Sequence, residues 1–153
     1  MDIYYNPLDS ACKSVCGGIR KNESFTIQVY GKSDEPCRFV LQQDGCEAQS
    51  LLMQKFLGGW KIELSFPETG LFFYWFRIGG RRAGMGKDRL LSFSENAPAY
   101  QILVYREDFV TPDWFKGGIM YQIFPDRFCR CGDVSVGKGQ WLHQNWDEKP
   151  EYR

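Results

Sequence analysis

This sequence of 153 residues has little of the chemistry that most catalytic and metal sites need. His143 is its single histidine, so no histidine cluster can form a metal site or a catalytic triad. The sequence also has no Cys-x-x-Cys spacing, which argues against a structural zinc site. Its 19 basic and 19 acidic residues cancel, so no charge excess favours nucleic acid or an anionic membrane as a partner.

Long apolar runs are missing as well. None approaches the roughly 20 residues that a membrane span needs. The first residues lack the basic and apolar regions of a secretory signal. We therefore expect a cytoplasmic protein with reduced thiols. The alternative, for an exported chain, is a disulfide framework built on three pairs close in sequence: Cys12 with Cys16, Cys37 with Cys46, and Cys129 with Cys131.

What the sequence does contain is many aromatic residues, 16% in all, in short alternating segments. Residues 25–30 and 60–66 alternate apolar with polar side chains, which predicts half-buried strands. Residues 71–78 are apolar on both faces, as a central strand requires, and residues 100–105 form a last strand. Further strands are expected at residues 3–5, 38–42, 51–56 and 90–93. Residues 1–24 otherwise read as turns, and residues 79–86 read as a hairpin loop.

Seven or eight short strands separated by turn signals predict an all-β fold, an antiparallel β-sandwich, over residues 1–110. A polar linker follows at residues 111–117. Most aromatic side chains are expected to pack in the core, and Trp60 shares a strand face with core residues. Strand alternation predicts that one of Tyr74 and Trp75 is buried and the other exposed. Trp60, Tyr74 and Trp75 are the candidates for stacking on sugar rings.

The segment 119–124 is apolar except for Gln122 and ends at Pro125. Such a run fits a strand buried on both faces, as in a parallel sheet or barrel. Parallel strands need long crossovers to reach their partners, and the remaining residues offer none. We therefore expect residues 118–153 to be the start of a truncated α/β domain.

Residues 121–128 read Tyr-Gln-Ile-Phe-Pro-Asp-Arg-Phe, and this resembles the first barrel strand of the neopullulanase-like branch of the α-amylase family, glycoside hydrolase family 13. Residues 139–152 resemble the loop that follows that strand. The resemblance implies that residues 1–110 are an N-terminal Ig-like accessory domain of the early-set type. It also implies that residues 118–153 begin a (β/α)8 barrel, in an enzyme acting on maltodextrin, pullulan or cyclodextrin.

The same resemblance implies that the catalytic carboxylates lie on later barrel strands, so we expect no catalytic residue here and an inert chain. Asp126 is better explained by a structural role, either an ion pair with Arg127 or a cap of the loop, than by catalysis. Related enzymes hold calcium in the loop that follows, but Cys131 stands where asparagine is typical, and cysteine is a poor calcium ligand. Asp133 is the remaining candidate metal ligand. We expect no cofactor, with calcium in an intact enzyme as the alternative.

The partners implied are an α-glucan oligosaccharide, the chain's own catalytic barrel and a second copy of the chain. Trp141 and Trp146 flank His143 and would line the route to the substrate in an intact enzyme. Two alternatives stay open. The chain is a stand-alone carbohydrate-binding or protein-interaction module, or its tail strand adds to an edge of the sandwich.

Overall fold

A computed structural model describes residues 3–124, 132, 135 and 137–139. The chain divides into two units, Met1–Val110 and Thr111–Arg153. Within the described residues, all ten strands belong to the first unit. The remaining regular elements are two single-turn 3-10 helices, η1 (Lys87–Arg89) and η2 (Asp113–Phe115). The described chain is therefore mostly β, as the sequence predicted.

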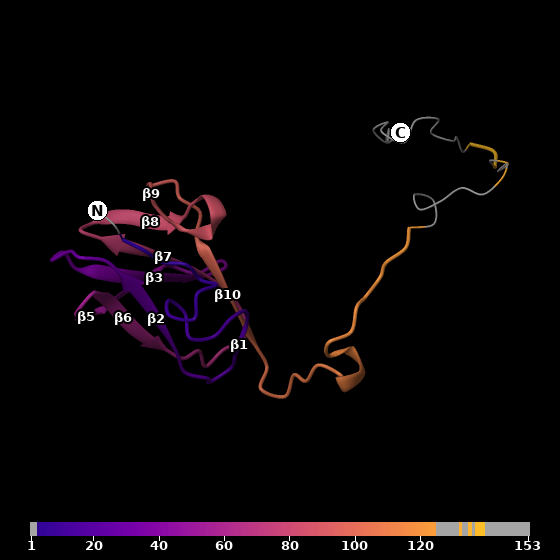
Figure 1. The fold of residues 1–153 in the computed structure, drawn as a ribbon, viewed down its shortest axis with the longest axis horizontal. Coiled ribbons are helices and arrows are strands. Elements are labelled where there is room, and N and C mark those ends of the chain that lie inside the picture. Colours follow the sequence, from indigo (N-terminus) through magenta and orange to yellow (C-terminus); the bar gives the residue numbers. More distant parts are fainter. Residues whose placement is uncertain (1–2, 125–131, 133–134, 136, 140–153) are drawn as a thin grey trace. The chain divides into compact units, whose positions relative to one another are not determined.

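Two sheets face each other across one core, as a β-sandwich requires (Figure 1). The larger sheet has the order β1-β10-β7-β3-β4, with β8 and β9 added beside β7. Its strands are β1 (Ile19–Arg20), β3 (Cys37–Gln43), β4 (Gln49–Leu52), β7 (Gly70–Ile78), β8 (Arg81–Met85), β9 (Leu91–Phe93) and β10 (Tyr100–Tyr105). The smaller sheet has the order β2-β6-β5, made of β2 (Phe25–Tyr30), β5 (Gln54–Phe56) and β6 (Gly59–Leu64).

Strand β7 organises the larger sheet, as its apolar character on both faces predicted. It pairs with β3 along one edge and with β10 and then β8 along the other. All these pairs are antiparallel. The exception in the sheet is β1, a two-residue strand that pairs parallel with β10. The sequence missed β1 because two residues are too few to show a period.

The predicted strand at residues 51–56 is two strands in two different sheets. Strand β4 pairs with β3 in the larger sheet, whereas β5 pairs with β6 in the smaller one. The chain crosses between them at Met53, whose side chain is 3% exposed and whose Sδ lies 3.4 Å from Cys37 Sγ. This buried residue fixes the crossing, which the pattern of residues 51–56 by itself does not show.

The prediction of a loop at residues 79–86 is wrong. Gly79 and Gly80, with φ of 57° and 80°, form a two-residue turn, and β8 follows at once. Positive φ at both central residues is the geometry that suits the twist of hairpin strands. Ala83 of β8 is fully buried, and β9 pairs with its other edge. The glycines and arginines gave this strand the composition of a loop.

Aromatic rings fill the centre of the sandwich. Tyr5, Tyr74 and Tyr100 form a buried cluster whose ring centroids are 5.2–6.3 Å apart. The hydroxyls of Tyr5 and Tyr74 share a hydrogen bond of 2.6 Å, and the Tyr100 hydroxyl donates to the carbonyl of Gly84 at 3.3 Å. Residues 3–5, expected to form an edge strand, make an isolated bridge between Tyr4 and Tyr30 that brings Tyr5 inward. Each polar group in this cluster therefore has a partner.

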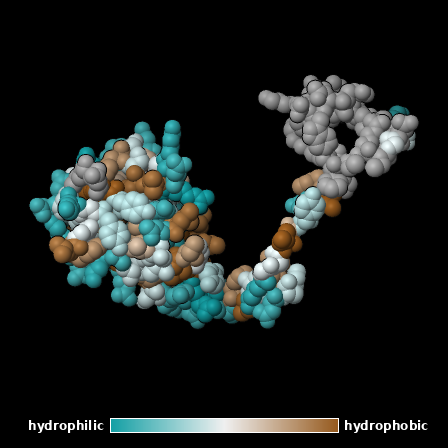
Figure 2. All heavy atoms as spheres, viewed as in Figure 1, coloured by the Kyte–Doolittle hydropathy of each residue, from teal (hydrophilic) through white to brown (hydrophobic). Residues whose placement is uncertain are grey.

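The described part of the second unit has no strand. Residues 119–124, predicted to be one, are extended and exposed, with Ile119 97% and Tyr121 71% exposed. Figure 2 shows hydrophobic side chains on the surface of this segment. A strand needs a neighbour that takes up its backbone hydrogen bonds. The alternative in which this segment extends a sheet of the sandwich is not seen in the described residues, where no strand pairing involves it.

Candidate functional site

None of the three aromatic residues predicted to stack on sugar presents an open ring face. Trp60 and Tyr74 are 1% and 0% exposed and lie in the core, as expected for Trp60. Trp75 points to the outer face of the larger sheet, but it is only 9% exposed. The Arg82 guanidinium lies 4.2 Å from its ring centroid and covers it. A sugar-binding surface therefore has to be sought elsewhere.

The predicted metal ligand Asp133 lies outside the described residues, and so do Asp126, Cys131 and His143. Trp141 and Trp146 also fall outside them, so the expectations for these side chains stay predictions. Among the described residues, no group of three or more histidine, cysteine, aspartate or glutamate side chains could hold a metal ion. The cysteines of the described part, Cys12, Cys16, Cys37 and Cys46, are free thiols. No helix in the described part is long and apolar enough to cross a membrane.

The outer face of the smaller sheet carries a groove of about 530 Å³, which we call the small-sheet groove. It is formed by side chains of β2, β6 and β5 together with the end of β4. Its lining residues are Thr26, Gln28, Leu52, Gln54, Phe56, Lys61, Ile62 and Glu63. The alternation that buries Phe25, Ile27 and Val29 turns Thr26 and Gln28 of the same strand outward.

Strand register brings the polar lining residues together. Lys61 of β6 lies between Gln28 of β2 and Gln54 of β5, so these three side chains form a row across the sheet. Glu63 of β6 is paired with Thr26 of β2 in the adjacent row. Cross-strand neighbours point to the same face, so both rows open into the groove.

Most of these polar side chains have no partner in the part of the chain that the structure describes. Within the described residues, the side chains of Thr26, Gln54, Lys61 and Glu63 make no hydrogen bond or ion pair. Gln28 is held weakly, since its Oε1 accepts a 3.4 Å hydrogen bond from the Tyr30 hydroxyl. The groove therefore offers donors and acceptors to an external ligand, and its charges, one ammonium and one carboxylate, cancel.

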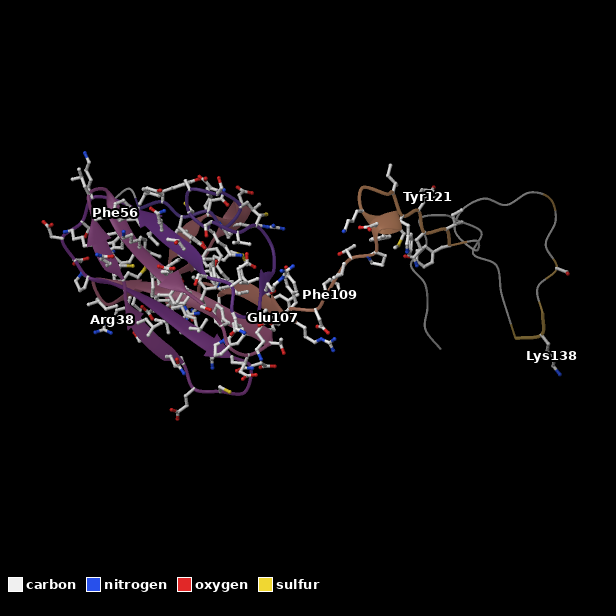
Figure 3. All side chains as sticks on the ribbon, turned by 90° about the horizontal axis from the view of Figure 1, so that it is seen from below. Arg38, Phe56, Glu107, Phe109, Tyr121 and Lys138 are labelled. Carbon is white, nitrogen blue, oxygen red and sulfur yellow. The ribbon has the colours of Figure 1, made fainter. Side chains whose placement is uncertain are left out.

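An aromatic pair closes one end of the groove. Tyr30 and Phe56 are both paired with Gly59, which has no side chain between them, and their rings meet edge to face at 5.9 Å. The Tyr30 hydroxyl donates to the Ala11 carbonyl at 3.1 Å and so fixes its ring. A Cβ on Gly59 would lie 2.0 Å from the Val29 carbonyl oxygen, so only glycine fits. Figure 3 shows Phe56 on the sandwich.

A second hollow of about 380 Å³ lies beside the β6–β7 turn. Leu64, Phe66 and Phe72 give it an apolar floor, while Glu47 and Glu68 stand at its edge with no cation among its lining residues. It lacks the mixed and balanced polar groups of the small-sheet groove. The small-sheet groove therefore suits a neutral polar ligand better than the second hollow does.

Sequence analysis missed the small-sheet groove, although part of the signal was present. Alternation along residues 25–30 and 60–66 already placed Thr26, Gln28, Lys61 and Glu63 opposite the core. The contribution of Gln54 and Phe56 depends on the crossing at Met53, which no local pattern revealed. Large aromatic side chains are the usual sign of sugar stacking, and this favoured Trp60, Tyr74 and Trp75 as the candidates.

Comparison with known proteins gives distant relatives over nearly the whole chain. An amylopullulanase of Thermoanaerobacterium thermosulfurigenes is 29% identical over 182 residues, which covers 98% of this chain and 10% of that enzyme. An amylopullulanase of Thermoanaerobacterium saccharolyticum is 28% identical, covering 98% of this chain and 14% of the enzyme. A third amylopullulanase, from Thermoanaerobacter thermohydrosulfuricus, is also 28% identical, covering 98% of this chain and 12% of the enzyme.

The chain is thus distantly homologous to a small region of amylopullulanases, and it spans about a tenth to a seventh of the length of these curated relatives. No protein-family model matches the chain. No solved structure matches it significantly either.

Proposed function

We propose that this chain is an accessory β domain of a glycoside hydrolase that acts on α-glucans. The observation that supports this most directly is the similarity of 98% of the chain to a segment of amylopullulanases, whose remaining length consists of other sequence. In this proposal residues 1–110 are an Ig-like sandwich of the early-set type. Residues 118–153 begin a catalytic (β/α)8 barrel, and the parent enzyme cleaves maltodextrin, pullulan or cyclodextrin.

The described residues fit a binding or supporting role better than a catalytic one. A retaining glycosidase needs two carboxyl groups about 5–5.5 Å apart, one on each side of the scissile bond. The small-sheet groove is lined by a single carboxylate, Glu63. In this proposal the carboxylates that cleave the glucan lie on later strands of the parent enzyme's barrel.

The exposed apolar segment supports the proposal of further protein around it. Ile119, Met120 and Phe124 are 97%, 73% and 57% exposed in the described chain. Apolar side chains gathered on a surface in this way mark a place where other protein packs. The partner we propose is the chain's own catalytic barrel. We also propose that the parent enzyme is cytoplasmic and forms a homodimer.

A stand-alone carbohydrate-binding or interaction module is the second candidate. It is favoured by one observation: the buried core residues that the structure describes all lie between Tyr5 and Val104, inside the first unit. A sandwich with a complete core can fold and act alone.

The two candidates predict different lengths and activities for the natural protein that contains this sequence. An antibody raised against the 153-residue chain would be used to precipitate that protein from its source cells. The precipitate would then be run on a gel containing pullulan or starch and renatured. The proposal predicts a protein much longer than 153 residues that clears α-glucan at its own position. A short protein with no clearing would favour the stand-alone module.

A further inference from the structure

We propose that the small-sheet groove is a binding site for an α-glucan chain, held by Gln28, Gln54, Lys61 and Glu63 against the Phe56 ring. The α-glucan identity of the ligand rests on the proposed function. The site itself is derived from its own geometry.

Charge balance indicates a neutral ligand. Lys61 and Glu63 are two residues apart on β6, both exposed, and their side chains do not pair with each other. A polyanion attracted by Lys61 would be repelled by Glu63, and a cation attracted by Glu63 would be repelled by Lys61, so neither gains a net attraction. A neutral chain that both donates and accepts hydrogen bonds can use the two groups at once, because ammonium donates and carboxylate accepts.

The hydrogen-bonding inventory points to hydroxyl groups. Gln28 and Gln54 each carry an amide with two donor hydrogens and one acceptor oxygen, and Thr26 adds a hydroxyl. Each sugar hydroxyl is likewise a donor and an acceptor, so it can be matched by any of these groups. The row Gln28, Lys61 and Gln54 spans three strands, a width of about 10 Å. That width accommodates more than one sugar unit.

The apolar groups of the groove suit the faces of sugar rings. Phe56 is half-buried, held edge-on by Tyr30, so one part of its ring remains at the groove surface. Leu52, 62% exposed, supplies further apolar surface beside the polar rows. A ligand with polar edges and apolar faces, which a pyranose ring is, satisfies both kinds of surface. The groove volume of about 530 Å³ is in the range of ordinary ligand sites.

The polar residues of the site can be changed without harming the fold. Gln54, Lys61 and Glu63 are exposed and contribute no side-chain hydrogen bond to the described structure. Gln101 of β10 provides a matched control, since it is an exposed strand glutamine on the other sheet with no side-chain hydrogen bond.

The test is a titration of the isotopically labelled 153-residue chain with maltoheptaose, followed by amide chemical shifts. We expect saturable shifts confined to β2, β5 and β6. Gln54→Ala and Lys61→Ala should each weaken binding about threefold to tenfold, the loss of one hydrogen bond. Phe56→Leu should weaken it by a similar factor with the fold retained, and Gln101→Ala should leave it unchanged.

Saturable shifts elsewhere, unaffected by these substitutions, would overturn the groove assignment. A folded chain with no shifts at millimolar maltoheptaose would overturn glucan binding by this site. Either result leaves the proposed function standing, because an accessory domain can serve as a scaffold and the precipitated natural protein would still clear α-glucan. Equal binding of maltoheptaose and a β-linked glucan would contradict the α-glucan identity of the ligand.

Discussion

At the scale of single residues, the tyrosine cluster shows how aromatic content is used in this core. Tyr5, Tyr74 and Tyr100 bring polar hydroxyls into a region where an unpaired one is costly. The hydrogen bond of 2.6 Å between Tyr5 and Tyr74 joins the N-terminal segment to the central strand of the larger sheet. This contact lies between residues far apart in sequence, so it stabilises tertiary rather than local structure.

We expect Tyr5→Phe to lower the free energy of unfolding by about 1–3 kcal/mol, because it leaves the buried Tyr74 hydroxyl without its partner. The double variant Tyr5→Phe/Tyr74→Phe should cost little more than the single one, since the second change removes the orphaned group. Urea denaturation of the unaltered chain, the single variant and the double variant gives the three free energies of unfolding. Tyr105→Phe, which loses no hydrogen bond, is the control. Additive losses in the double variant would contradict this account.

The same cluster predicts instability in alkali. Burial raises the pKa of Tyr5, Tyr74 and Tyr100 in the folded protein. The unfolded chain then releases these protons first, so their stabilising contribution is complete below about pH 10 and is lost as pH rises above it. We expect unfolding above pH 10, followed by circular dichroism, to coincide with a late rise in tyrosinate absorbance. Ionisation of all eight tyrosines in a single step near pH 10, with the fold intact, would refute this.

At the scale of elements, strong alternation was the best guide. The strand predicted at residues 25–30 is β2 to the residue, and that at residues 100–105 is β10. Alternation is a local property, and a strand with one buried face has to show it. The predictions at residues 79–86 and 51–56 failed because these segments are determined by contacts distant in sequence. Strand β8 has the composition of a loop, but pairing with its neighbours β7 and β9 makes it a strand. The break at Met53 arises because the chain passes there from the larger sheet to the smaller one.

The β7–β8 turn can be tested at Gly80, where φ is 80° and an added Cβ atom would have no neighbouring atom within 4 Å. Gly80→Asn should leave the free energy of unfolding nearly unchanged, because asparagine tolerates positive φ. Gly80→Val should lower it by about 1–2 kcal/mol, because a β-branched side chain does not. Since the position is open to solvent in both variants, thermal denaturation of the pair isolates the backbone effect. Equal stability of the two variants would rule out this turn geometry.

The site residues show a similar division between local and non-local information. Sequence alternation predicted that one of Tyr74 and Trp75 is buried and the other exposed, and the two side chains do lie on opposite faces of β7, Tyr74 in the core and Trp75 outside it, although both are buried. It could not show that Arg82 would cover the Trp75 ring, because that contact depends on the pairing of β8. For the same reason it left Gln54 and Phe56 out of the candidate site.

At the scale of the whole molecule, all core residues of the described chain lie in the first unit, Met1–Val110. The last contacts of this unit are made just after β10, where Phe109 packs against Tyr105 at 5.8 Å and Glu107 accepts a hydrogen bond from Asn22 (Figure 3). The chain beyond Val110 contributes no buried side chain in its described residues. The sandwich should therefore not depend on it for stability.

A chain ending at Val110 should unfold cooperatively in urea with the same midpoint as the 153-residue chain. One ending at Tyr105 should unfold at lower urea, because it loses the contacts of Glu107 and Phe109. A Val110 chain that shows no cooperative transition would place part of the core beyond residue 110.

The most direct test of the account as a whole is the mobility of the 153-residue chain in native gels that contain soluble amylose. An accessory domain that holds α-glucan in the small-sheet groove should be retarded by amylose and not by a cellulose derivative. The variant Gln54→Ala/Lys61→Ala should run nearly as in a gel without polysaccharide, and Gln101→Ala should be retarded like the unaltered chain. Equal mobility of the unaltered chain in all three gels would contradict the account.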